Sequence, residues 1–262
     1  MKKAEIYPPR PPVSLKKWMT LSLFLALIWL CAWETEVTLG ELIDGIPEMG
    51  KFITKMFPPD WEYIRVVIKP MVETVQMAIL GTTFGAILAF PVAFLAAGNV
   101  TRPWFLRAPA RFILNLTRTI PDLLFAAFFA TIVGYGPVAG MLALTFFSFG
   151  ILSKWAYESV ETIDHGPMEA MTAVGANKLQ WIHYGVLPQV TTQFIGFVMY
   201  MFEINIRAAA ILGYVGAGGI GIYLNRTLGM FRYDQTFIII LFTLIIVLVI
   251  DAVSSRIRGK LI

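Results

Sequence analysis

Residues 169–188 read E-A-M-T-A-V-G-A-N-K-L-Q-W-I-H-Y-G-V-L-P, a polar stretch that is compatible with helix. It lies between two apolar segments, residues 137–157 and 189–212. A helix that crosses a bilayer needs about 20 apolar residues at a rise of ~1.5 Å per residue, so both segments are long enough. A polar loop of this length between two such segments indicates a membrane protein that meets a partner outside the bilayer.

The composition of the whole chain agrees with a membrane protein. Of its 262 residues, 57% are hydrophobic and 15% are charged, and the mean hydropathy is +0.70. Soluble domains carry roughly a quarter charged residues. The segments long enough to span a bilayer, or nearly so, are residues 18–33, 71–97, 111–133, 137–157, 189–212 and 235–253. The expected fold class is therefore all-α, a polytopic membrane protein with about six transmembrane helices.

The distribution of Lys and Arg predicts the orientation. If the N-terminus is inside, the cytoplasmic segments hold most of these residues, and the first external loop is acidic. Short basic flanks on the cytoplasmic side are what the positive-inside rule expects. We therefore expect a multi-pass protein with cytoplasmic N- and C-termini, and the net charge of +4 reflects this topology rather than nucleic-acid binding.

Two regions are expected along the chain. Residues 1–70 comprise a Pro-rich cytoplasmic arm at 1–15, the first transmembrane helix and an external amphipathic segment at 34–70. Residues 71–262 form the transmembrane domain, with the long loop 158–188 between its fourth and fifth spans.

The polar loop has the pattern of a docking element. Pro167 favours a helix that begins near Glu169, and Gly175 is expected to break it. A second short amphipathic piece follows, and Pro188 is expected to stop it where the next span starts. The first helix carries a small apolar ridge made of Ala170, Ala173 and Val174. Such a helix can enter a groove on another protein, and the alternative is an ordinary surface helix that links two spans.

The loop resembles the one by which permease subunits of ATP-binding-cassette importers bind their ATPases. That family has the pattern E-A-A, three residues, Gly, nine residues, Ile, one residue, Leu-Pro. Met171 and Gly185 depart from this pattern in the present chain. The resemblance implies a cytoplasmic coupling helix between the fourth and fifth spans. The ATPase-docking residues that it implies are Glu169, Ala170, Gly175, Leu187 and Pro188.

Two further stretches resemble the phosphonate type of these type I importer permeases. Residues 117–124 read T-R-T-I-P-D-L-L, and residues 203–221 read E-I-N-I-R-A-A-A-I-L-G-Y-V-G-A-G-G-I-G. The similarity covers roughly residues 70–255. It implies a homodimeric permease of the bacterial inner membrane, two ATP-binding-cassette ATPase subunits and a periplasmic phosphonate-binding protein.

The function that the resemblance implies is the translocation of phosphonate or a related phosphorus oxyanion, phosphite or phosphate, driven by a separate ATPase subunit. Three alternatives stay open. The chain could be a permease for another small solute such as an amino acid, a secondary transporter that needs no ATP, or an intramembrane enzyme.

Polar residues within the predicted spans are candidates for the substrate path. A charge inside a spanning helix costs a few kcal/mol or more, so it usually faces a cavity or is paired. The candidates are Arg118, Glu203, Asn205 and Arg207. Either Arg could contact an oxyanion through its planar fork. As an equal alternative, Glu203 and Arg207 form a structural i, i+4 pair, and Arg118 pairs with Asp122.

The sequence holds no set of catalytic residues. The G-x-G-x-x-G at 216–221 follows an apolar span and lacks the strand that a dinucleotide site needs, and the chain has no G-x-x-x-x-G-K-[ST] motif. The only histidines, His165 and His183, lie in the docking loop. We therefore expect a transport subunit that is not an enzyme and has no cofactor and no metal site.

Overall fold

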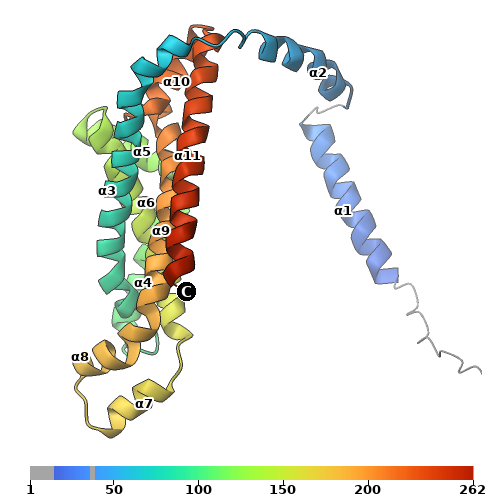
Figure 1. The fold of residues 1–262 in the computed structure, drawn as a ribbon. Helices are drawn as coiled ribbons and strands as arrows, with labels where there is room; N and C mark the ends of the chain where they lie inside the picture. The colour runs from blue at the N-terminus through green and yellow to red at the C-terminus, as the bar shows by residue number, and fades with distance from the viewer. Residues whose placement is uncertain (1–14, 36–38, 262) are drawn as a thin grey trace, which may run out of the picture. The chain divides into compact units, whose positions relative to one another are not determined.

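The computed structural model describes residues 15–35 and 39–261, and every regular element in these ranges is a helix (Figure 1). The all-α prediction is confirmed. The chain divides into two units after Lys55. The cytoplasmic arm predicted for residues 1–15 lies, except for Leu15, outside the described residues.

The first unit consists of two described helices. α1 (Leu15–Glu34) is apolar and long enough to cross a membrane, and it contains the span predicted at 18–33. α2 (Leu39–Thr54) has an apolar and a charged face, as expected for the amphipathic segment. Pro47 lies inside α2.

The second unit is built on the long helices α3 (Ile64–Ala96), α6 (Pro137–Glu161), α9 (Leu187–Leu212) and α11 (Tyr233–Leu261) (Figure 1). They contain the spans predicted at 137–157, 189–212 and 235–253, and all but the last residue of the span predicted at 71–97. Long helices suit a lipid environment because each satisfies its backbone hydrogen bonds internally. α3 packs most extensively against α6, α9 contacts both, and α11 packs on α9.

Small residues set the distance between α3 and α6. A Cβ added at Gly81 would lie 2.5 Å from the Cβ of Leu144, and one at Gly85 would lie 2.5 Å from the Cβ of Ser148. Close approach through small residues is the usual way in which membrane helices associate, because lipid removes the hydrophobic driving force between them.

The third predicted span, residues 111–133, differs from expectation because it is broken. α4 (Trp104–Thr119) and α5 (Asp122–Val133) meet at an angle of 92°. Pro121 disfavours helical backbone at the residue before it, and Ile120 is extended, with φ −87° and ψ 119°. Counting this bent pair as one span, the described residues contain six candidate spans, which agrees with the number predicted.

A glycine-rich turn connects α9 to α10 (Ile220–Gly229) through the short 3-10 turn η3 (Gly213–Val215). Gly216, Gly218 and Gly219 have φ values of 78°, 88° and 70°, which L side chains rarely adopt. The backbone N–H of Ile220 donates to the hydroxyl of Thr74 on α3 at 2.8 Å. Helices flank the turn on both sides, so it is not a dinucleotide-binding unit.

Candidate functional site

The docking loop begins with a capped helix, α7 (Gly166–Ala173), which has Pro167 in its first turn. It starts at Gly166, slightly before the predicted Glu169. Gly175 has a φ of 71° and donates its N–H to Thr172 O at 3.1 Å, while Ala176 donates to Met171 O at 3.0 Å. This pair of bonds is the Schellman arrangement that ends helices at a left-handed glycine. The predicted break at Gly175 is confirmed.

The prediction that Pro188 stops the second piece is wrong. α8 (Lys178–Gln180) passes through a π-helical turn, η2 (Trp181–Val186), directly into α9. The N–H of Leu187 donates to Ile182 O, five residues back. This wider turn leaves room for the ring of Pro188 and tolerates the absence of its backbone N–H. The helical path from the loop into the bundle is therefore uninterrupted.

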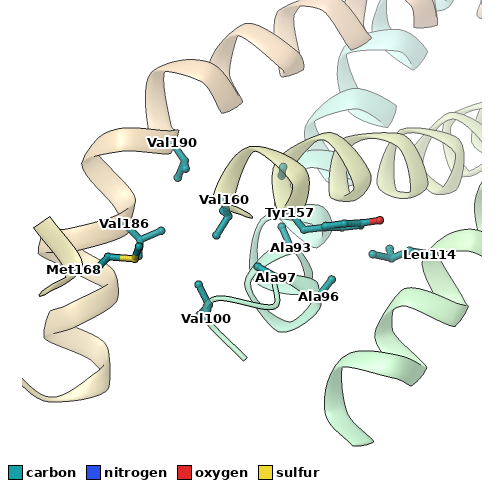
Figure 2. Close-up of a cluster of buried hydrophobic side chains, with 11 residues drawn as sticks. Ala93, Ala96, Ala97, Val100, Leu114, Tyr157, Val160, Met168, Val186 and Val190 are labelled. Carbon is teal, nitrogen blue, oxygen red and sulfur yellow. The ribbon is translucent and has the colours of Figure 1, made fainter. Parts of the chain in front are cut away.

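The base of the loop is fixed to the bundle. Met168 of α7 is 4% exposed and packs in a cluster with Val160, Val186 and Val190 (Figure 2). The indole N–H of Trp181 donates to Met168 O at 3.0 Å. Gly185 stands where the family pattern has Ile, and a Cβ there would lie 3.5 Å from the Cα of Met168. The π-helical turn thus lies within van der Waals contact of α7 at this position.

The opposite side of the loop is open. Val174 is 75% exposed and Leu179 is 79% exposed, and Glu169, Ala170 and Ala173 are also exposed. An open cavity of about 860 Å³ separates α7 from the segment 98–102 that follows α3. The predicted apolar ridge is thus free to meet a partner. Of the remaining docking candidates, Pro188 is exposed and Leu187 is half-buried.

Arg118 stands apart from the other path candidates. It lies in the last turn of α4, is exposed, and its Cγ lies 3.1 Å from where a Cβ at Gly150 of α6 would be. No described residue forms an ion pair with it. The alternative partner Asp122 instead accepts from the N–H of Leu123 at 2.9 Å, at the start of α5. The break between α4 and α5 therefore leaves Arg118 unpaired beside the middle of α6.

Glu203 is the centre of a small ion cluster. Its carboxylate lies 2.8 Å from Arg207 and 3.4 Å from Arg258 on α11, and its side chain is 12% exposed. The predicted i, i+4 pair is present. The contact with Arg258 places this pair at the level of the C-terminal end of α11.

Asn205 lies inside the bundle. Its side chain is fully buried and donates from Nδ2 to the hydroxyls of Thr82 on α3 at 2.7 Å and Ser148 on α6 at 2.6 Å. Among the described residues, no hydrogen bond or ion pair joins Asn205 or the Glu203 cluster to Arg118. The structure therefore does not bring the four path candidates together.

We expect Asn205→Ala to lower the free energy of unfolding by about 1 kcal/mol, the scale of polar contacts between membrane helices. The substitution removes the donor that links α3, α6 and α9. Thermal unfolding in detergent measures the change. Asn225→Ala, on the exposed surface of α10, is the matched control. Equal losses in the two variants would contradict the interhelical role.

Sequence reasoning missed a polar contact at the end of the bundle that bears the docking loop. Glu161, the last residue of α6, pairs with Arg111 of α4. The sequence shows Glu161 only as one of several carboxylates between Lys154 and Lys178, so it gave no signal that singles out this residue.

Comparison with known proteins identifies the family. Residues 81–261 match the family of the binding-protein-dependent transport system inner membrane component. The phosphite transport system permease protein PtxC of Stutzerimonas stutzeri is 37% identical over 83% of this chain and 79% of its own. The phosphate-import permease protein PhnE of Mycolicibacterium smegmatis is 36% identical over 88% of this chain and 43% of its own.

Solved structures agree on the fold. A chain of the inward-facing MetNI methionine ABC transporter has a TM-score of 0.68 at 22% identity and covers 78% of this chain and 99% of its own. Because the identity is low, this likeness shows the fold alone. The family match and the relatives over most of the chain show that this protein belongs to the inner membrane components of binding-protein-dependent transport systems, transport subunits rather than enzymes.

Proposed function

We propose that this chain is the permease subunit of an importer that moves a phosphorus oxyanion, phosphonate, phosphite or phosphate, across the inner membrane. The observation that supports this choice of substrate is the similarity to phosphite and phosphate permeases over most of the chain. ATP is hydrolysed in a separate subunit, and a binding protein outside the membrane delivers the substrate.

In the proposed complex, two ATPase subunits bind the docking loops of two permease subunits, the second being another copy of this chain. Both termini lie in the cytoplasm. The exposed ridge of α7 enters a groove on the ATPase, with Glu169 and Ala170 at the contact and Gly175 shaping its end. Leu187 and Pro188 direct the chain into α9. The exposed side chains of Val174 and Leu179 support this arrangement, because a partner would bury them.

Arg118 is the path residue that the geometry favours. A cation that is unpaired inside a span usually faces a cavity or a water-filled passage. In a complex of two permease subunits, the exposed side of α4 and α5 can face such a passage, and the guanidinium can donate to a passing oxyanion. Glu203, Asn205 and Arg207 then have a structural role, because they hold together the helices of the bundle.

We expect Arg118→Gln to reduce the initial rate of uptake by ~10- to 100-fold, the scale of a lost hydrogen bond to a charged group. Uptake of labelled phosphite or phosphate into cells measures it. Arg256→Gln changes an exposed arginine of α11 and serves as the control. Uptake in the Arg118 variant that equals uptake in the control would remove Arg118 from the path.

A competition assay tests the cargo. Uptake of a labelled oxyanion by cells that carry the complete importer is challenged with methylphosphonate, phosphite, phosphate or methionine. Competition by at least one phosphorus oxyanion and none by methionine supports the proposal. No importer-dependent uptake of a labelled oxyanion, together with uptake of labelled methionine, would assign the chain to amino-acid import.

A further inference from the structure

A polar contact joins three helices beside the docking loop. Glu161 of α6 accepts a hydrogen bond from the backbone N–H of Gly98 at 2.6 Å and another from the guanidinium of Arg111 on α4. Arg111 also donates from Nε to the carbonyl of Ala96, the last residue of α3, at 2.8 Å. Both charged side chains are about one-third exposed. One carboxylate thus connects the C-terminal end of α6 to the middle of α4 and to the segment that follows α3.

The carboxylate of Glu161 needs these donors because of its position at the end of α6. A carboxylate at the C-terminus of a helix is opposed by the helix dipole, so its place there is stabilised by the cation and the N–H that face it. Arg111 also lies over the ring of Tyr157, 4.9 Å from its centroid. Asn99 donates to the carbonyl of Val160 at 2.6 Å and caps the same helix end.

α4 has few other attachments. Leu114 is its only fully buried side chain among the described residues, and much of the remaining helix surface is exposed. The contact of Arg111 with Glu161 is therefore a main polar link between α4 and the bundle. Arg118 follows Arg111 by about two turns, or ~10 Å, on the same helix.

On the other side, Glu161 is close to the docking loop along the chain. Only residues 162–165 separate α6 from α7. This connection is held to α9, because Gln189 accepts from the N–H of Asp164 at 3.1 Å and donates to its carbonyl at 3.2 Å. Ser159 of α6 also donates to Gln193 at 2.5 Å. A displacement of α7 therefore reaches the end of α6 through a short, bonded segment.

We infer that the Glu161–Arg111 contact transmits movement of the docking loop to α4, and through α4 to Arg118 at the broken span. Glu161 and Arg111 are positioning residues, because they act through α4 and contact no substrate. The inference rests on the proposed function, since it needs an ATPase that moves the loop.

The test measures the ratio of ATP hydrolysed to substrate imported by the complete complex in proteoliposomes. The amount of assembled complex is measured alongside it. Glu161→Gln keeps an acceptor for Gly98 and Arg111 and loses the charge, so it is expected to assemble and to raise this ratio by ~5-fold. Glu161→Ala removes the acceptor as well, and the expected rise is ~10-fold or more, within the range of coupling energies between sites. A purely structural role would lower the amount of complex and leave the ratio unchanged.

Glu158→Gln is the matched control. Glu158 lies one turn earlier on α6 and pairs with Lys154 of the same helix, so its loss breaks no link between helices. The control is expected to keep the wild-type ratio. An unchanged ratio in assembled Glu161→Gln, or an equal rise in Glu158→Gln, would overturn the inference. Absence of ATP-driven uptake in the wild-type complex would instead refute the proposed function.

Discussion

Gly221→Ala is expected to prevent correct assembly of the bundle. A Cβ at Gly221 would overlap the carbonyl oxygen of Ala210 and approach the Cα of Gly213 to 2.9 Å. Both are backbone atoms, so a change of rotamer cannot relieve the overlap. The expected loss is at least ~3 kcal/mol, the upper end for overpacking, and folded protein should fall sharply in size-exclusion profiles.

The control for this substitution is Gly196→Ala, in the interior of α9. A Cβ at Gly196 meets no atom within 4 Å. This variant is expected to fold as well as the wild type, or better by up to about 1 kcal/mol, because Ala is the stronger helix former. Similar profiles for the two variants would show that the turn after α9 tolerates a side chain, contrary to its geometry.

The second large effect is expected at the docking loop, where Gly175→Val should strongly reduce ATP-driven uptake while the bundle stays folded. The φ of 71° at Gly175 costs an ordinary residue ~1–2 kcal/mol, and a β-branched residue more. The end of α7 would then rearrange and displace the exposed Val174. Uptake and substrate-stimulated ATP hydrolysis should fall by ~10-fold or more.

Gly175→Asn separates backbone strain from added size. Asn tolerates left-handed backbone, and the space around Gly175 is open, with no atom within 4 Å of an added Cβ. This variant is expected to retain most of the uptake. Wild-type uptake in Gly175→Val would remove the loop from energy coupling.

Much of this fold was accessible from the sequence because membrane helices are specified by long apolar runs. The spans predicted at 137–157, 189–212 and 235–253 lie within observed helices, and the span predicted at 71–97 does so except for its last residue. The break at Ile120 was harder to predict, because residues 111–133 together are long enough for one span. Pro121 and the polar stretch around it, residues 115–122 (N-L-T-R-T-I-P-D), are its signals in the sequence. The expectation that a proline stops a helix failed at Pro188, because a π-helical turn before it accommodates the proline within a continuous helical path.

Only those features of the candidate site that depend on residues close together in the sequence were predictable. The exposed ridge and the glycine break of the docking loop depend on neighbouring residues, so spacing predicts them. Contacts between distant segments do not show in a single sequence. Asn205 reads as a polar residue in a span, and only the structure places it between Thr82 and Ser148. The link from Glu161 to Gly98 and Arg111 also joins segments far apart in the chain.

We propose that this chain moves a phosphorus oxyanion when an ATPase acts on its docking loop. The most direct measurement is uptake of labelled phosphite, methylphosphonate or phosphate into proteoliposomes that contain the permease, its ATPase and its binding protein, with ATP or a non-hydrolysable analogue inside. Uptake of at least one of these anions is expected with ATP only. Equal uptake with the analogue, or after the ATPase is omitted, would contradict the proposal.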